Sequence, residues 1–446
     1  NGKALSLDTP IITPDGWKVM GDLRVGDYVY GADGKPTRIT YVSETFLDHD
    51  CYEVEFEDGE KIIADAGHIW RVMTKESRRA VKRKCKSKKR YRNDYHEGQG
   101  YFNITTEEMA RDYVYMRADG KGCEYKYRVP VAAPLEFGEK ELPVKPYTLG
   151  VWLGDGSSKS PEVTCSDSDL AELREHIEQD GYQTKVYYKR NRAKSIGIGI
   201  TPRGQENKFL SGLKTIGVFE NKHIPEVYLR SSIEQRMELL RGLMDTDGFV
   251  EKRGQCEFVQ KNKRLIDDFS ELLSTLGIKH TIREKRARCN GKDAGVVYSI
   301  LFYADQTNPC FKLARKKARL KGKLAPRMKN KSIVGIRKVE TVPTRCIAVE
   351  NDDRLFLAGR RMTVTHNTRL IAALAWALAL LERKSGSKIY IVGAALRQAL
   401  QSFNFIKFNI RQMGEEDNFR ILDNNQEHSI SGELGDGSLF IEALAA

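Results

Sequence analysis

The first third of the chain alternates short apolar runs with glycine and aspartate turns, which is typical of a compact all-β domain. Within the runs, apolar and polar positions alternate with the period of two of half-buried strands. We expect strands at Ala4–Thr13, Thr37–Ser43, Tyr52–Phe56, Lys61–Ala64 and Tyr127–Val131. Asp58 and Gly59 predict a hairpin turn. A helix is expected at Thr105–Arg111, with Thr105 as N-cap and Glu108 in its first turn.

The centre of the chain contains an internal repeat: an apolar helix, a strand, a second helix, a glycine turn and a further strand. The first copy starts at Thr148–Gly156 and the second at Leu240–Gly248. The elements expected to follow are Glu162–Cys165, Ser168–Gln179 and Thr184–Tyr188, then Glu257–Gln260, Arg264–Leu276 and Lys279–Glu284. Small residues spaced four apart in each helix share one face, so the two helices are expected to pack closely there. These residues are Gly150, Gly154, Gly242 and Thr246.

The last part alternates helix-length and strand-length apolar segments, as α/β proteins do. The expected elements are helices at Thr368–Glu382 and Leu396–Met413, and strands at Lys388–Gly393, Phe419–Leu422 and Ser438–Glu442. The longest apolar run, Leu370–Leu381, is too short to span a bilayer, so no membrane partner is expected.

Composition adds a preference for a polyanionic partner. The 446 residues carry a formal net charge of +13, and the length favours two to four domains. The eight cysteines include no Cys-x-x-Cys pair, which argues against zinc ribbons and fits a reducing cytoplasm. The chain lacks an initiating Met and ends abruptly, which suggests a fragment of a longer precursor.

The two ends of the chain complete one motif when they are read together. Asn1-Gly2-Lys3 at the start and Thr368 near the end form the Gly-Lys-Thr of a phosphate-binding loop followed by an apolar helix. In such loops the lysine reaches the β- and γ-phosphates and the threonine coordinates Mg²⁺. Ala4–Asn367 is therefore predicted to be an insertion, and Lys3 and Thr368 are expected to bind ATP and Mg²⁺ once it is removed.

The segment after the insertion resembles phage terminase large subunits. The similarity rests on Val392–Ala395, Gln398 and Gly437–Phe440. It implies a DNA-packaging ATPase that acts with phage packaging proteins in a bacterial cell, encoded by a phage or prophage. A helicase or another P-loop ATPase is the alternative.

Motifs at both ends of the insertion resemble the Hedgehog/intein (HINT) fold of protein splicing elements. The first block is Asp8-Thr9-Pro10 with Gly21–Asp27, and the last blocks are Thr344–Val349, Phe356–Gly359 and Val364–Thr368. Ala4 has no nucleophile at the position where most inteins carry Cys or Ser. The combination of Trp70, Cys346 and Thr368 resembles the signature of class 3 inteins.

The class 3 resemblance implies a four-step route. Cys346 attacks the Lys3–Ala4 bond and gives a branched thioester, and Thr368 then takes the acyl group. Asn367 cyclises and releases the element, after which an O-to-N shift leaves a Lys3–Thr368 peptide bond. No cofactor is needed.

The assisting groups are expected to be histidines. His68 is positioned by motif to polarise or protonate the scissile amide, and His366 to assist cyclisation of Asn367. Asp65 and Arg354 stand where inteins often carry Thr and His, so their roles stay open. The alternative chemistry is direct attack by Thr368 on Lys3, with Cys346 a spectator.

Both repeat helices resemble the LAGLIDADG motif of homing endonucleases, whose half-domains have an αββα order. The resemblance implies that Asp155 and Asp247 meet at the helix ends, bind Mg²⁺ and support metal-assisted cleavage of both DNA strands. Basic stretches predict the DNA-facing surface: Lys75–Arg92, Lys189–Lys194, Lys261–Arg264 and Arg283–Lys292. Lys261 and Lys263 are candidates for an auxiliary catalytic lysine.

Together these observations predict a multidomain protein: an all-β HINT domain interrupted by an α+β endonuclease, followed by a P-loop α/β ATPase fragment. The expected boundaries are 1–3 (host remnant), 4–135 (HINT, with a basic insertion at 75–98), 136–325 (endonuclease), 326–367 (HINT) and 368–446 (host). The excised element is expected to be a monomer that binds the double-stranded DNA of the uninterrupted host gene. The alternative function is a DNA-binding ATPase with an inactive structural insert.

Overall fold

The computed structural model describes residues 3–77, 100–116, 122–188, 194–202, 205–289, 292–366, 387–393, 400, 403, 406–407, 410, 416–424, 427–434 and 437–445. Residues 1–367 and 368–446 form two separate compact units. Asn367, Thr368, the predicted helix Thr368–Glu382, most of the helix Leu396–Met413 and most of the basic stretch Lys75–Arg92 lie outside the described residues. In the part of the chain that is described, no helix is long and apolar enough to cross a membrane.

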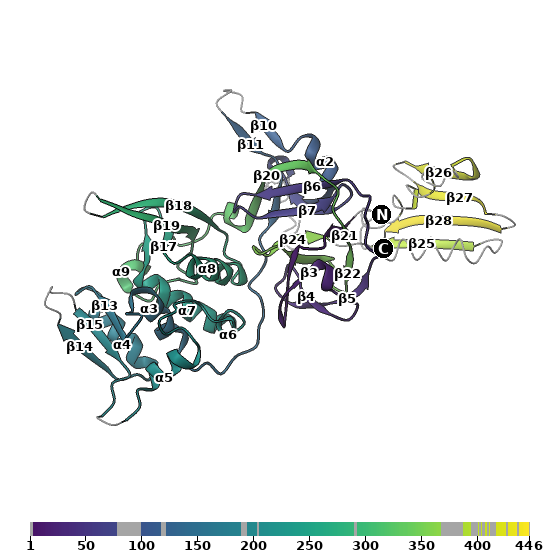
Figure 1. The fold of residues 1–446 in the computed structure, drawn as a ribbon. Coiled ribbons are helices and arrows are strands. Elements are labelled where there is room, and N and C mark those ends of the chain that lie inside the picture. Colours follow the sequence, from purple (N-terminus) through teal and green to yellow (C-terminus); the bar gives the residue numbers. More distant parts are fainter. Residues whose placement is uncertain are drawn as a thin grey trace, which may run out of the picture. The chain divides into compact units, whose positions relative to one another are not determined.

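Within the first unit, residues 3–135 and 326–366 form a β-domain built on one large sheet (Figure 1). Its strand order is β21-β1-β7-β6-β20-β12-β8-β9. The bounds are β1 Leu5–Ser6, β6 Cys51–Phe56, β7 Lys61–Asp65, β8 Ile69–Met73, β9 Tyr101–Thr105, β12 Arg128–Pro130, β20 Asn330–Val339 and β21 Thr344–Arg345. Because β1 pairs with both β7 and β21, the start of the predicted insertion lies beside a strand from near its end.

Smaller sheets complete the β-domain. Strand order β22-β5-β4 forms one sheet, and β2-β3, β23-β24 and β10-β11 form two-stranded ones. The bounds are β2 Pro10–Thr13, β3 Gly16–Val19, β4 Tyr28–Tyr30, β5 Pro36–Val42, β10 Val114–Met116, β11 Cys123–Tyr125, β22 Ile347–Val349, β23 Leu355–Ala358 and β24 Thr363–His366, with η1 Met20–Asp22 and α2 Thr106–Arg111. Helix α2 has the predicted Thr105 and Glu108 capping box. The single strand expected at Ala4–Thr13 is instead two strands, because the Thr9 amide turns back to the Ser6 carbonyl at 3.1 Å.

Residues 136–325 form a repeat domain in which two helices, α3 and α7, lie between two sheets (Figure 1). The first half contains α3 Pro146–Asp155, β13 Glu162–Cys165, α4 Leu170–Gln179, β14 Thr184–Tyr188, β15 Lys194–Ile198, α5 Lys208–Thr215 and α6 Glu226–Leu229. The second contains α7 Ile233–Thr246, β16 Gly248–Val250, β17 Gln255–Gln260, α8 Lys263–Thr275, β18 His280–Cys289, β19 Lys292–Tyr303 and α9 Ala314–Lys317; η2 Pro326–Lys329 follows. The predicted strands β13 and β14 are confirmed to the residue, whereas the hairpin partners β15 and β19 were not predicted.

The close approach of α3 and α7 depends on the predicted small residues. A Cβ on Gly242 would lie 2.8 Å from the Val151 nitrogen and 3.0 Å from the Gly150 Cα atom. These atoms belong to a packed helix backbone, which cannot move aside as a flexible side chain can. Glycine at this crossing is therefore required by the helix packing.

Replacing Gly242 with alanine should lower the free energy of unfolding of the repeat domain by about 2 kcal/mol or more, because overpacking exceeds the gain in helix propensity. Denaturant unfolding of a chain made splicing-inert by Asn367→Ala and Cys346→Ala measures the change. Gly138→Ala is the matched control, since a Cβ there has nothing within 4 Å. Equal unfolding midpoints for the two variants would contradict the packing role.

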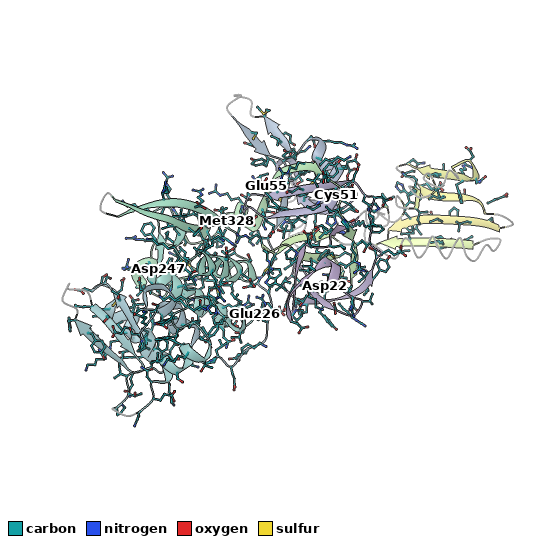
Figure 2. The ribbon with its side chains drawn as sticks, in the orientation of Figure 1. Asp22, Cys51, Glu55, Glu226, Asp247 and Met328 are labelled. Carbon is teal, nitrogen blue, oxygen red and sulfur yellow. The ribbon has the colours of Figure 1, made fainter. Side chains whose placement is uncertain are left out.

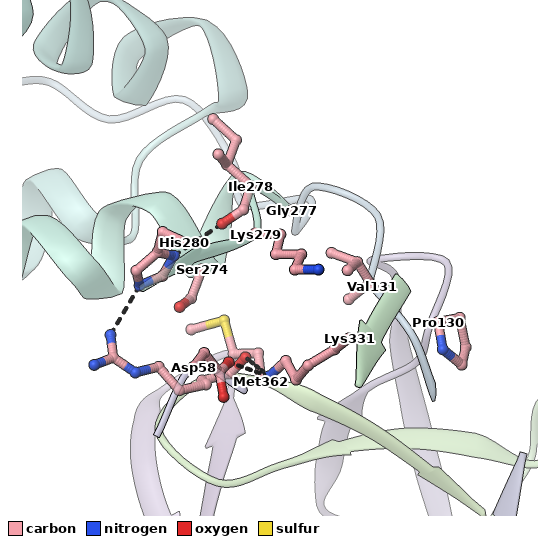
Figure 3. A pocket seen from close by; sticks show the side chains of 12 residues that line it. Asp58, Pro130, Val131, Ser274, Gly277, Ile278, Lys279, His280, Lys331 and Met362 are labelled. Carbon is pink, nitrogen blue, oxygen red and sulfur yellow. Dashed lines mark hydrogen bonds and ion pairs between the residues drawn. The ribbon is translucent and has the colours of Figure 1, made fainter. Parts of the chain in front are cut away.

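The β-domain and the repeat domain meet across a buried polar interface (Figure 3). Lys331 pairs with Asp58 at 2.6 Å and donates to Thr363 Oγ1 at 2.9 Å. From the repeat domain, His280 Nε2 lies 2.8 Å from Arg361 Nη1. Burial, together with the positive charge of Arg361, lowers the pKa of His280 to about 3, so its imidazole is neutral at neutral pH. The neutral ring can therefore accept the arginine hydrogen bond without placing two cations together.

The second unit contains a four-stranded sheet among its described residues, in the order β25-β28-β27-β26. The bounds are β25 Ser387–Gly393, η3 Glu416–Asn418, β26 Phe419–Asp423, β27 His428–Leu434 and β28 Gly437–Ala445. β25 pairs in parallel with β28, and the other neighbours are antiparallel. Three of the strands were predicted, and β27 was not.

Candidate functional site

The first residue of the predicted insertion is held at both of its backbone groups by Asp65, at the end of β7. The Ala4 amide donates to Asp65 Oδ2 at 3.1 Å, and the Asp65 amide donates to the Ala4 carbonyl at 3.0 Å. Ala4 is fully buried. The peptide bond between Lys3 and Ala4 thus enters the protein interior in a defined orientation.

The sheet register brings Cys346 to this bond. Leu5 pairs with Arg345 in the antiparallel β1–β21 ladder, so the next step of the register places Cys346 opposite Ala4. The Cys346 amide donates to Ser43 Oγ at 3.0 Å, and the Ser43 amide donates to the Cys346 carbonyl at 2.9 Å. The cysteine is buried and its backbone is fixed, as a positioned nucleophile requires.

His68 links the start of the insertion to the strand that precedes its end. The imidazole is fully buried, and its Nε2 lies 2.5 Å from Thr365 Oγ1 on β24. Burial lowers the pKa of His68 to about 4, while an interaction with the Lys3 backbone partly opposes this shift. An interaction that raises a histidine pKa is one with an acceptor, although Nδ1 makes no hydrogen bond of good geometry among the described residues. His68 is therefore a neutral imidazole near Lys3.

Trp70 contacts the predicted site through this histidine. Its ring packs edge-on against His68 with a centroid separation of 4.9 Å, and its indole nitrogen donates to Thr106 Oγ1 at 3.0 Å. Trp70 is also part of the β-domain core. Trp70 is therefore expected to contribute to the site by packing against His68 and fixing the orientation of its ring.

His366 is the last described residue of β24 and pairs with Leu355. It is buried, and its Nε2 lies 3.5 Å from Asn103 Nδ2 on β9. Because Thr365 contacts His68, the following His366 carries the chain from His68 towards Asn367 and Thr368, which lie outside the described residues. The structure thus brings together His68, Trp70 and Thr365, and Cys346 directly follows Arg345, which pairs with Leu5 next to Ala4.

The sequence left the roles of Arg354 and Asp65 open, and the structure shows different contacts for each. Arg354 adopts a φ of 57° and donates to the Val349 carbonyl at 2.7 Å, so it shapes the turn before β23. Asp65 holds Ala4, as described above, and also lies 3.2 Å from His49 Nδ1. His49 has no motif around it, and sequence reasoning missed it.

A second site lies where α3 and α7 end in the repeat domain, at Asp155 and Asp247 (Figure 2 labels Asp247). The two carboxyl groups are within hydrogen-bonding reach of each other. Burial raises the pKa of both groups, and the charge of Asp155 raises that of Asp247 further. The Gln260 side-chain amide donates to Asp247. Two ionised carboxylates that are buried side by side repel each other, which raises the free energy of the doubly charged pair. A divalent cation bound between them would offset this repulsion.

Two lysines close this site in a nearly symmetric manner. Lys222 Nζ donates to the carbonyls of Leu153, Gly154 and Gly156 at 3.0, 3.0 and 2.7 Å. Lys316 Nζ does the same at the end of α7, at 2.9 Å to Met244, 2.7 Å to Asp245 and 2.6 Å to Gly248. Burial lowers the pKa of each ammonium group to about 8, and the nearby aspartates oppose the shift.

The prediction of Lys261 or Lys263 as the auxiliary group stays a prediction. Lys263 forms an ion pair with Asp267 on α8, because both side chains project from the same exposed helix face. The sequence contained one usable signal: Lys222 and Lys316 follow Asp155 and Asp247 at closely similar separations. That relation becomes meaningful only when the helix ends are known to meet.

The carboxylate pair fits a hard divalent cation, since its donors are oxygens. No cluster of three or more His, Cys, Asp or Glu side chains that could hold a metal occurs among the described residues. An ion at Asp155 and Asp247 would therefore need further oxygens from water or a phosphodiester, as Mg²⁺ commonly does.

Comparisons with known proteins agree with the repeat domain and revise the host. Residues 234–306 match the LAGLIDADG-like domain. The chain is 38% identical over 374 residues to the replicative DNA helicase DnaB of Mycobacterium intracellulare, an alignment that covers 83% of this chain. It is 28% identical over 167 residues to the homothallic switching endonuclease of Saccharomyces cerevisiae, covering 32% of this chain. The chain spans 59% of the length of the first relative and 28% of the second.

Among solved structures, the crystal structure of the MchDnaB-1 intein (N145AA) aligns with 82% of this chain and 99% of its own length, at 16% identity and a TM-score of 0.27.

The expectation of a terminase-like host with phage packaging partners is wrong. The relative that aligns with most of the chain is named a replicative DNA helicase. The motifs behind the terminase prediction, a buried strand end and a glycine turn, are common to many P-loop ATPases, so they do not separate these classes. The wider prediction of an enzyme with a homing endonuclease domain agrees with the family match, which covers most of the second half of the repeat domain.

Proposed function

We propose that the chain excises Ala4–Asn367 and joins Lys3 to Thr368 through a branched thioester on Cys346. The observation that supports this proposal is the β1–β21 register: it pairs Leu5 with Arg345, the neighbours of Ala4 and Cys346, and Ala4 has no nucleophile of its own. The buried His68 beside Lys3 and the fixed backbone of Cys346 support the same route.

In the first step, Cys346 Sγ bonds to the Lys3 carbonyl carbon. Neutral His68 carries one ring proton, which lies on Nδ1 when Nε2 accepts from Thr365. Nδ1 makes no hydrogen bond of good geometry among the described residues, so its proton is available to the carbonyl oxygen of Lys3 during the reaction. Such a donor stabilises the negative charge that develops on the oxygen. Breaking the C–N bond leaves the host segment as a thioester and Ala4 with a free amine.

In the following steps, the Thr368 hydroxyl takes the acyl group from Cys346, and the Asn367 side-chain nitrogen attacks its own carbonyl carbon. His366, held on β24 beside Asn103, is the proposed acid–base group for this cyclisation. Strand β24 fixes the approach to Asn367, which supplies the orientation that an unassisted cyclisation lacks. The ester then shifts from oxygen to nitrogen and leaves a normal peptide bond.

The repeat domain is proposed to cleave double-stranded DNA within the uninterrupted host gene. Asp155 and Asp247 would hold Mg²⁺, which supplies Lewis-acid activation of water and of the scissile phosphodiester. Lys222 and Lys316, with pKa values near 8, each place an ammonium group at one helix end, where it can stabilise charge on one DNA strand. Arg283, Lys285 and Arg286 on β18 supply positive charge for the DNA backbone.

The host is proposed to be a replicative helicase of the DnaB type, as the aligned relative suggests. Lys3 and Thr368 would then complete its ATP and Mg²⁺ site after splicing. Thr368 would act twice, first as acyl acceptor and later as a metal ligand. Host activity would thus depend on clean excision.

Expression of the chain with longer host flanks tests the splicing proposal. Mass spectrometry should find a ligated host with a Lys3–Thr368 bond and a free element spanning Ala4–Asn367. The Asn367→Ala variant is the control and should yield no ligated host. Intact precursor from the parent chain under reducing conditions would refute the proposal.

A further inference from the structure

We propose that Asp65 is the catalytic acid that protonates the Ala4 nitrogen when the Lys3–Ala4 bond breaks, and that His49 returns a proton to it from solvent. The inference rests on the proposed attack by Cys346. It assigns a role to two residues that the intein resemblance does not account for.

The chemistry needs an acid at this nitrogen. An amide nitrogen leaves poorly as an anion, so it must gain a proton as the tetrahedral intermediate collapses. Attack by Cys346 converts the planar nitrogen into a pyramidal one with a lone pair that can accept that proton. Asp65 Oδ2 already lies 3.1 Å from this atom, which is within the reach expected of a catalytic acid.

The surroundings of Asp65 favour a carboxyl group that holds its proton. The residue is 1% exposed, and burial raises its pKa above the ordinary value. Oδ2 accepts from Ala4 and contacts His49, whereas Oδ1 is buried without a hydrogen bond of good geometry among the described residues. For donation to Ala4 the proton must lie on Oδ2, the oxygen that contacts both the Ala4 nitrogen and His49.

His68 is less suited to this task. Its pKa of about 4 leaves it unprotonated at neutral pH, and its contacts are to Thr365 and to the Lys3 carbonyl side of the bond. The two residues therefore divide the work on the scissile amide. His68 serves the oxygen and Asp65 the nitrogen.

His49 connects this buried acid to solvent. Its Nδ1 lies 3.2 Å from Asp65 Oδ2, and its side chain is 26% exposed. Phe46 stacks on its ring at a centroid separation of 4.4 Å and fixes the ring plane. The same loop holds Cys346 through Ser43, so one segment positions both the nucleophile and the proton relay.

The proton balance closes. The Cys346 thiol loses one proton to solvent as the S–C bond forms. Asp65 gives one proton to the Ala4 nitrogen as the C–N bond breaks, and solvent returns one proton to the carboxylate through the His49 ring. The net change is a thioester and a neutral amine from a thiol and an amide.

The rate at which the Lys3–Ala4 bond breaks depends on whether Asp65 is protonated. Facing groups that titrate are His49 from the preceding loop, Cys51 across the β6–β7 ladder, His68 on the following turn and Cys346 beside β1. A raised pKa keeps the acid protonated to higher pH, and the rate contribution is lost as pH rises through that pKa. The pH profile should therefore show a fall in rate as the pH rises through the raised pKa of Asp65, which is called the alkaline fall below.

The test uses the full chain with a longer N-terminal host flank and with Thr368→Ala and Asn367→Ala, which together stop the reaction at the branched thioester on Cys346. Hydroxylamine release of the flank measures the rate of the first step against pH. Asp65→Asn keeps an oxygen acceptor for Ala4 but removes the acid, so the rate should fall by about 10²-fold or more and the alkaline fall should disappear. His49→Gln should slow the step by about 10-fold and move the alkaline fall.

Asp50→Asn is the matched control, since Asp50 in the same loop pairs with Lys338 on the exposed surface at 2.7 Å. Parent-like rates for Asp65→Asn, or a slower rate that keeps the alkaline fall, would overturn the proposal. An unchanged profile for His49→Gln would overturn the relay even if Asp65→Asn failed to fold. A parent chain that releases no flank would instead refute the Cys346 route itself.

Discussion

Cys346→Ala should abolish joining of Lys3 to Thr368, with a loss of rate of at least about 10⁴-fold, the scale on which enzymes lose rate when their nucleophile is deleted. Ala4 provides no replacement, and His68 and Asp65 act on an amide that nothing attacks. The measurement follows ligated host and free element by mass over time, in the chain with longer flanks. Branched intermediate should also be absent.

Cys123→Ala is the control for this variant, because Cys123 is exposed on β11 and has no place in the proposed route. It should splice at the parent rate. Undiminished splicing by Cys346→Ala would assign the first attack to Thr368, and Cys346 would then be a spectator.

Asp155→Asn or Asp247→Asn should reduce cleavage of the uninterrupted host gene by at least about 10²-fold, with splicing unchanged. Each substitution removes one carboxylate of the proposed metal pair, and the splicing groups lie in the β-domain. Cleavage of supercoiled plasmid with Mg²⁺ measures the effect. Lys222→Met and Lys316→Met should act in the same direction, since each removes one ammonium group from the site.

Unfolding measurements distinguish a variant that has lost only the proposed metal site from one that no longer folds. Burial and Asp155 raise the pKa of Asp247, so at neutral pH its charged form costs folding free energy. Asp247→Asn removes this cost and should unfold at a temperature equal to or above that of the parent. Asp267→Asn, which alters an exposed ion pair on α8, is the control and should cleave normally. Parent-like cleavage by Asp247→Asn would exclude this carboxylate pair as the metal site.

Much of the fold follows from local patterns in the chain. The capping box at Thr105 and Glu108 and the strands of the first repeat copy appear where periodicity predicts them. Gly150 and Gly242 predict the helix crossing because a small residue is needed wherever two helix backbones approach closely. The terminase prediction failed for the opposite reason: its motifs were short and shared by several ATPase classes.

Residues with a motif around them could be found in the sequence, and residues that act through a contact could not. Ala4, His68, Trp70, Cys346 and His366 stand in recognisable blocks. His49 stands in a loop without one, and Lys222 and Lys316 follow helices by many residues. Each obtains its role from an atom distant in sequence: the Asp65 carboxyl for His49, and helix-end carbonyls for the lysines.

The sequence by itself determined which residue types are available for splicing and DNA cleavage, and it predicts an element inserted between Lys3 and Thr368 with an inert first residue. The tertiary structure decided which residues lie near one another. A strand register pairs Leu5 with Arg345, the neighbours of Ala4 and Cys346, and a helix crossing places the ends that carry Asp155 and Asp247 together. The tertiary structure also determines the proton affinity of each side chain. The pKa depends on burial and on the surrounding charges, and neither is visible until the chain has folded.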